Sequence, residues 1–134
     1  MLPHSVNWLA VLVAALSGFV IGGLWYGPLF RSPWMRFSGM TFERGKQQNR
    51  PLVFGGAYLM NLVSAFGLSM LIGGHGGWAV GLHTGALTGL FFVAPALGVI
   101  YLFESRPFGL WAINGGYQVV NLAAMGTLLG AWPW

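Results

Sequence analysis

Cysteine is absent from this 134-residue sequence, and charged side chains are scarce. The lack of cysteine excludes disulfides, thiol catalysis and cysteine-ligated metal, so redox chemistry says nothing about the compartment. Charged residues make up only 6% of the chain, whereas 56% of its residues are hydrophobic. A soluble domain carries about 25% charged residues, so this chain could not cover itself with a polar surface in water.

Acids are the rarest charged residues, and their scarcity restricts the chemistry. The two acids, Glu43 and Glu104, are far apart in the sequence, and no nucleophile-base motif accompanies either one. His4, His75 and His83 match no established zinc spacing and have no acid or cysteine to join them. We therefore predict that the protein is not an enzyme and uses no metal or cofactor.

The stretch from Asn7 to Met35 contains the clearest structural signal. Its first twenty residues are uncharged, and about 20 helical residues cross the hydrocarbon core of a bilayer. The stretch then reaches Trp25-Tyr26-Gly27-Pro28, and Arg31 and Arg36 follow. A span, an aromatic anchor, a helix breaker and a positive loop thus arrive in that order. Residues 1–4 contain no Lys or Arg, so we expect no cleaved signal peptide.

Three further apolar stretches complete the predicted fold. We predict an all-α, polytopic membrane protein that forms a single domain over residues 1–134 with four transmembrane helices. In the third span Pro95 removes one helical hydrogen bond and predicts a kink. The expected spans cover residues 6–26, 52–72, 79–103 and 108–130.

The distribution of basic residues predicts the orientation. Five of the six bases lie in the polar loop 28–51, and Arg106 lies in the short connection 104–107. By the positive-inside rule both segments are cytoplasmic, so both termini are external and the membrane is the inner membrane. Orientation explains these bases better than nucleic-acid binding does. The loop could also bind anionic lipid, against the simpler interpretation of surface attraction alone. Its bases are Arg31, Arg36, Arg44, Lys46 and Arg50.

Small residues recur on two spans at helical spacing. Gly18 and Gly22 continue a stripe of alanines in the first span, and Gly81, Gly85 and Gly89 form a second stripe. Such stripes let helices approach closely, either within one chain or between copies. Because four short helices enclose little interior, we predict a homo-oligomer.

The second and fourth spans share a weak internal repeat. Gly55-Gly56 and Asn61-Leu62 recur sixty residues later as Gly115-Gly116 and Asn121-Leu122. Two helix hairpins in the same orientation would form a parallel repeat, although apolar helices also match by chance.

Polar side chains in the spans are the candidate site. Asn114, Gln118 and Asn121 recur at i, i+4 and i+7, with Tyr117 beside them, and Asn61 lies at similar depth in the second span. Lipid cannot satisfy amides, so this face should point into the bundle. It could line a pocket for an uncharged or zwitterionic ligand, or simply hold helices together by hydrogen bonds.

Glu104 is the only acid near a span, at the predicted inner boundary. An ionisable group at membrane depth would be a functional candidate. Its position two residues from Arg106 favours a structural ion pair instead.

Three motifs carry a family resemblance. Asn7-Trp8-Leu9-Ala10-Val11, the run Gly23 to Phe30 and the last helix from Ile113 to Trp132 resemble a family of small bacterial membrane proteins, the domain of unknown function seventeen sixty-one. The resemblance implies a four-helix integral membrane protein and no particular activity.

The leading functional prediction is a small transport or ligand-binding protein that uses the polar intramembrane face for an unidentified small molecule. The alternative is a structural or accessory protein that acts through helix association. Membrane lipids are the expected partners in both cases.

Overall fold

The structure, a computed structural model, describes residues 6–73 and 76–133, and every regular element in those ranges is helical. The all-α prediction is therefore confirmed for this part of the chain. The helices are α1 (Trp8–Leu24), η1 (Trp25–Leu29), α2 (Arg31–Ser38), α3 (Phe42–Gln47), α4 (Arg50–Ile72), α5 (Gly77–Thr88), η2 (Gly89–Val93), α6 (Ala94–Phe103) and α7 (Phe108–Ala131).

Side-chain caps set several helix starts. The side chain of Asn7 accepts a hydrogen bond from the Ala10 amide at 3.1 Å, which caps α1, and Asn49 caps α4 in the same way through the Leu52 amide. Each cap satisfies a backbone donor that the first turn leaves unpaired. The helix α3 begins after Thr41, so much of the predicted loop 28–51 is helical in α2 and α3.

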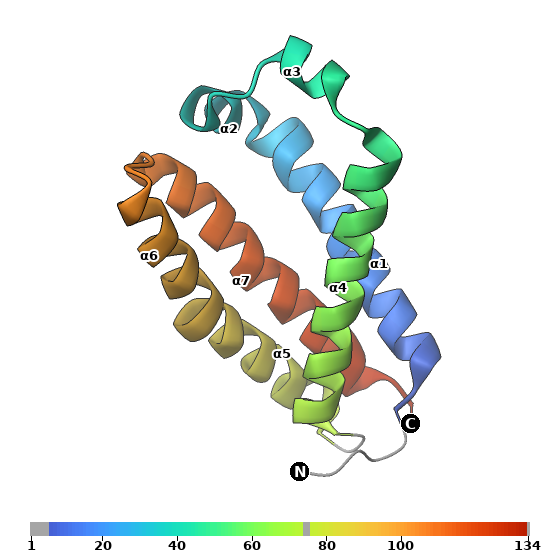
Figure 1. Ribbon diagram of the computed structural model, residues 1–134. Helices are drawn as coiled ribbons and strands as arrows, with labels where there is room; N and C mark the ends of the chain where they lie inside the picture. Colours follow the sequence, from blue (N-terminus) through green and yellow to red (C-terminus); the bar gives the residue numbers. More distant parts are fainter. Residues whose placement is uncertain (1–5, 74–75, 134) are drawn as a thin grey trace.

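The long helices form two antiparallel hairpins that point the same way (Figure 1). α1 pairs with α4, and the continuous segment from α5 to α6 pairs with α7. We call the end that carries α2, α3 and the α6–α7 connection the basic end, because all six Lys and Arg residues belong to it. α1 begins and α7 ends at the opposite end.

The two halves of the predicted repeat meet in the middle of the bundle. α4 and α7 run in the same direction (Figure 1), and the matched residues Asn61 and Asn121 hydrogen-bond to each other. Equivalent residues meet in this way when two similar hairpins are related by an axis along the bundle. The geometry thus agrees with a parallel repeat.

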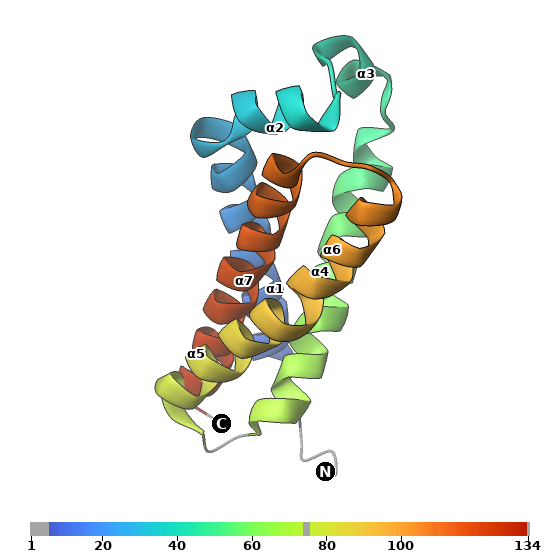
Figure 2. The ribbon, with the colours of Figure 1, turned by 90° about the vertical axis from the view of Figure 1, so that its left-hand side faces the viewer.

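α7 lies at the centre of the bundle and contacts α1, α2, α4, α5 and α6. Figure 2 shows α2 lying across the basic end, above the start of α7. There the Phe37 ring packs where Gly109 has no side chain. Because neighbours surround α7, nine of its residues are buried.

Glycines bring α5 and α7 into backbone contact. A Cβ added at Gly81 or Gly85 would overlap the carbonyl oxygen of Gly126 or Leu122, respectively. At Gly126 a Cβ would in turn overlap the Gly81 carbonyl oxygen. Small residues permit this approach, and Cα–H groups can then face carbonyl oxygens across the interface. The second small-residue stripe therefore packs inside the chain.

Two π-helical turns accommodate prolines in the spans. Pro28 lies within η1, and Pro95 follows η2 by two residues. A π turn inserts one residue into the helix where a regular hydrogen bond cannot form. Near η2 the chain changes direction between α5 and α6 (Figure 2), which is the kink that Pro95 predicts.

Three helical stretches are long and apolar enough to cross a membrane: Trp8–Leu29, Arg50–Ile72 and Gly77–Phe103. Only 28%, 17% and 11% of their most apolar parts are buried, so their apolar side chains face outward. The described residues thus support three of the four predicted spans by length and apolarity, because α7 has 24 residues but does not reach the same hydropathy. Its amides and glycines, covered by the other helices, lower its hydropathy.

The glycine contact gives a matched pair of substitutions. Gly85→Ala would force a methyl group against the α7 backbone, so we expect a loss of about 1–3 kcal/mol and a lower melting temperature in detergent. Gly67→Ala, in the interior of α4 with open space around it, should be neutral or gain about 0.5–1 kcal/mol from helix propensity. Equal stability of the two variants would contradict the backbone contact between α5 and α7.

Candidate functional site

An amide pair joins α4 to α7 deep in the bundle. Asn121 is 1% exposed and donates from Nδ2 to Oδ1 of Asn61 at 3.2 Å. Asn121 Oδ1 has no hydrogen-bond partner among the described residues. It lies against Gly18, where a Cβ would overlap it, so the Gly18 Cα–H faces this oxygen. Asn121 therefore points into the bundle, as predicted for this polar face, and its partner there is Asn61.

Tyr117 extends this contact along α1. Its hydroxyl donates to the carbonyl oxygen of Gly18 at 3.0 Å, and a Cβ at Gly22 would come within 3.1 Å of the same hydroxyl. The two glycines of the first stripe therefore make room for the polar side chains of α7. This stripe, like the second, packs within the chain.

Asn114 connects three helices nearer the basic end. Its Oδ1 accepts a hydrogen bond from the Tyr26 hydroxyl at 2.6 Å, and its Nδ2 donates to the Tyr101 hydroxyl at 2.8 Å. Tyr26 belongs to η1 and Tyr101 to α6, so this chain of bonds ties these two elements to α7. Both amide functions of Asn114 are satisfied inside the bundle.

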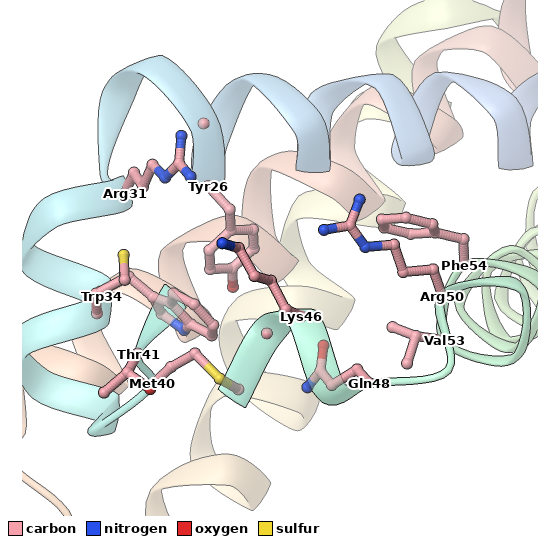
Figure 3. Close-up of a pocket in the computed structure, with 13 residues that line it drawn as sticks. Tyr26, Arg31, Trp34, Met40, Thr41, Lys46, Gln48, Arg50, Val53 and Phe54 are labelled. Atoms are coloured by element: carbon pink, nitrogen blue, oxygen red, sulfur yellow. The ribbon is translucent and has the colours of Figure 1, made fainter. Parts of the chain in front are cut away.

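A cavity of about 590 Å³ opens at the basic end, between α2, α3 and the start of α4 (Figure 3). We call it the basic cavity, because Arg31, Lys46 and Arg50 line it from three different helices. No acidic side chain is among the described residues that line it. Figure 3 shows Lys46 reaching toward Tyr26 and Arg50 lying beside Phe54.

The five predicted lipid-binding bases thus divide into two groups. Arg31, Lys46 and Arg50 line the basic cavity, whereas Arg36 and Arg44 do not. The Arg36 guanidinium lies 4.9 Å from the centroid of the Phe37 ring, and Arg44 is exposed on α3. The structure therefore gathers only part of the predicted set in one place.

An apolar groove of about 460 Å³ continues from the basic cavity between α1 and α4. The two share Tyr26, Gly27, Val53 and Phe54. Deeper in the bundle the groove ends at the polar side chains of Asn61 and Tyr117. Its other lining residues are Phe19, Gly22, Gly23 and Ala57.

A third cavity, of about 360 Å³, lies between η1, α2, α6 and α7. We call it the aromatic cavity, because four of its lining residues are aromatic and none is charged. Gln118 is among its lining residues, and the side chain of Gln118 has no hydrogen-bond partner among the described residues. The full lining is Tyr26, Trp34, Leu97, Tyr101, Asn114, Tyr117 and Gln118.

Tyr26, Trp34 and Tyr101 were not predicted from the sequence to be parts of a site. The aromatic run at Trp25-Tyr26 was predicted to be an interface anchor only. A usable signal was depth, since Tyr26, Tyr101 and Asn114 all lie within a few residues of the basic ends of their spans. Side chains at equal depth on neighbouring helices are the ones that meet.

The remaining candidates are isolated from these cavities. Glu104 Oε1 accepts from Arg106 Nε at 3.1 Å, so the predicted ion pair is confirmed, at an exposed position. His83 is exposed, and its Nδ1 lies 2.7 Å from the Ala79 carbonyl oxygen. His4 and His75 lie outside the described residues. Within the described ranges no group of three potential metal ligands occurs.

Comparison with known proteins supports the family resemblance. A family model described as "Protein of unknown function (DUF1761)" matches residues 9–130. No curated protein matches the chain, and no solved structure does. The matched range includes nearly all of both hairpins and every residue that lines the three cavities. The chain therefore belongs to the DUF1761 family, whose function is unknown.

Proposed function

We propose that this chain is a non-enzymatic membrane protein that crosses the bilayer four times and binds an amphiphile with an anionic head. Three helices support the span assignment by length and apolarity. α7 would be the fourth, since 24 residues at 1.5 Å rise extend about 36 Å and the hydrocarbon core measures about 30 Å. Its amides need no lipid-facing position, because other helices cover them.

The proposed location is the inner membrane of a bacterium, with the basic end in the cytoplasm and both termini external. All six Lys and Arg residues belong to the basic end, and the positive-inside rule places such residues on the cytoplasmic side. Exposed apolar side chains on α1, α4 and α6, among them Leu16, Met60 and Val99, would face lipid.

The observation that carries the binding proposal is the continuity of the basic cavity with the apolar groove. Three bases stand at one end, and the lining becomes apolar between α1 and α4. A phosphate or carboxylate head pairs with Lys and Arg, and an alkyl chain fits the apolar groove. Membrane lipids have this chemistry and reach the groove from the bilayer. Binding, or transport of the bound molecule, is the function this arrangement supports best.

A second candidate is a structural or accessory role through helix association. It is favoured by the Asn121–Asn61 bond, which uses two of the predicted polar residues to join helices rather than to bind a ligand. Self-association stays part of this proposal. Because both glycine stripes pack inside the chain, an oligomer would have to use other faces.

Lipid retention tests the binding proposal. In native mass spectrometry from a neutral detergent, the wild type should retain one phosphatidylglycerol per chain. Lys46→Gln combined with Arg50→Gln should weaken binding about 30-fold, since each base near a lipid surface contributes about 1 kcal/mol. Ala57→Phe, which narrows the groove without a charge change, should also weaken binding of the two-chain lipid.

The matched control keeps the same charge change in the same segment. Arg36→Gln combined with Arg44→Gln removes two bases that do not line the cavity, so binding should stay within about threefold of wild type. Equal losses in both double variants would show general surface attraction and contradict a defined site. A wild type that retains no lipid would also contradict a defined site.

Single cysteines test the topology, because the chain has none of its own. Gln47→Cys on α3 and Ala131→Cys at the end of α7 are both exposed positions. In intact cells an impermeant maleimide should label the cysteine at 131 and not that at 47, and both should react after lysis. Labelling of the cysteine at 47 in sealed cells would refute the proposed orientation.

A further inference from the structure

We propose that the aromatic cavity binds an ammonium group, so that the two cavities at the basic end together select a zwitterionic headgroup in which a phosphate is linked to an ammonium ion. This inference rests on the proposed amphiphile binding and identifies the class of headgroup. The shared chemistry belongs both to methylated heads of the phosphocholine type and to phosphoethanolamine.

The two cavities adjoin through the same two rings. Tyr26 and Trp34 line the basic cavity as well as the aromatic cavity. Their ring centroids lie 5.6 Å apart, with the planes at 72°. A headgroup bound at this pair can therefore place one charge in each cavity.

The rings that line the aromatic cavity lie at steep angles to one another. The planes of Tyr26 and Tyr117 meet at 64° with 5.4 Å between centroids, so successive rings present faces in different directions. Tyr101 adds a further ring from α6. A cation within about 6 Å of several ring faces is attracted by their negative quadrupoles, and aromatic cages recognise alkylammonium ions in this way.

Hydrogen bonds hold these rings before any ligand binds. The hydroxyls of Tyr26 and Tyr101 both hydrogen-bond to Asn114, which fixes these two rings relative to α7. A preorganised cage loses little conformational entropy on binding. Gln118 lines the cavity, and its side-chain amide has no hydrogen-bond partner among the described residues, so the amide oxygen can accept from an N–H of a primary ammonium.

The bases of the adjoining basic cavity add a second requirement, a negative charge on the bound headgroup. Arg31, Lys46 and Arg50 repel a bare ammonium ion but attract a phosphate. A simple cation is therefore disfavoured, and a simple anion leaves the aromatic cavity unused. A headgroup in which a short linker joins the phosphate to the ammonium can place one charge in each cavity.

Tyr101 offers a test that separates this inference from the proposed function, because it lines the aromatic cavity and neither the basic cavity nor the groove. The probes are phosphatidylcholine, phosphatidylethanolamine and phosphatidylglycerol with equal acyl chains, titrated by native mass spectrometry. The wild type should bind the two zwitterionic lipids about tenfold more tightly than phosphatidylglycerol.

Tyr101→Leu should abolish that preference and leave phosphatidylglycerol affinity unchanged, which also shows that the variant is folded. Tyr101→Phe, which keeps the ring but loses the hydroxyl bond to Asn114, should keep the preference at a reduced level. Gln118→Leu should weaken phosphatidylethanolamine more than phosphatidylcholine, because only the primary ammonium donates hydrogen bonds. If Tyr101→Leu loses all lipid binding, Leu97→Trp serves instead, since it fills the aromatic cavity from α6 and should likewise remove only the preference.

Equal wild-type affinity for all three lipids would overturn this inference and leave the proposed function intact. A zwitterionic preference that survives both Tyr101→Leu and Leu97→Trp would also overturn it. Failure to bind any of the lipids would overturn the proposed function together with the inference.

Discussion

The backbone contact between α5 and α7 is the interaction on which the rest of the arrangement depends. Gly81 and Gly85 allow the carbonyl oxygens of Leu122 and Gly126 to lie where a side chain would otherwise be. In a bilayer, apolar side chains gain nothing by leaving lipid for one another, so close packing and weak Cα–H to oxygen contacts hold helices together. This contact fixes α7 against the second hairpin and leaves its other faces for α1 and α4.

A central α7 explains how polar side chains can lie deep among the apolar helices. Asn121, Tyr117 and Asn114 each find partners on neighbouring helices, on α4, α1 and the pair η1 and α6 respectively. These hydrogen bonds join α7 to its neighbouring helices deep in the bundle. Toward the basic end α2 and α3 bridge from α1 to α4 (Figure 1), and the cavities open there rather than around the deep amides.

The fold followed from the sequence to a large extent, because apolar stretches and base-rich connections are local signals. The four long helical segments lie within a few residues of their predicted bounds. The helices α2 and α3 were not anticipated, since Arg31–Ser38 and Phe42–Gln47 are short and polar, and their position depends on packing such as Phe37 on Gly109. The apolarity of α7 was overestimated because its length and its flanking residues resemble those of a span. The other helices cover its polar residues, and a sequence pattern does not show such tertiary contacts.

The site was less predictable than the fold. Helical periodicity placed Asn114, Gln118 and Asn121 on α7, but it could not divide them between helix association and a cavity, because that depends on what faces them. Gln118 lines the aromatic cavity, while Asn121 is bonded to Asn61. Tyr26 contributes to all three cavities, yet its position follows from the π turn of η1, which no local pattern announces.

In the proposed binding mode an amphiphile enters between α1 and α4 with its charged head at the basic end. Photo-crosslinking with a phospholipid that carries a diazirine on one acyl chain tests this most directly, with the modified residues mapped by mass spectrometry. We expect one lipid per chain, attached in the groove at residues such as Phe19 and Ala57 and displaced by excess unlabelled lipid. Crosslinks spread over outward-facing side chains such as Phe91 and Phe92, undiminished by competitor, would contradict it.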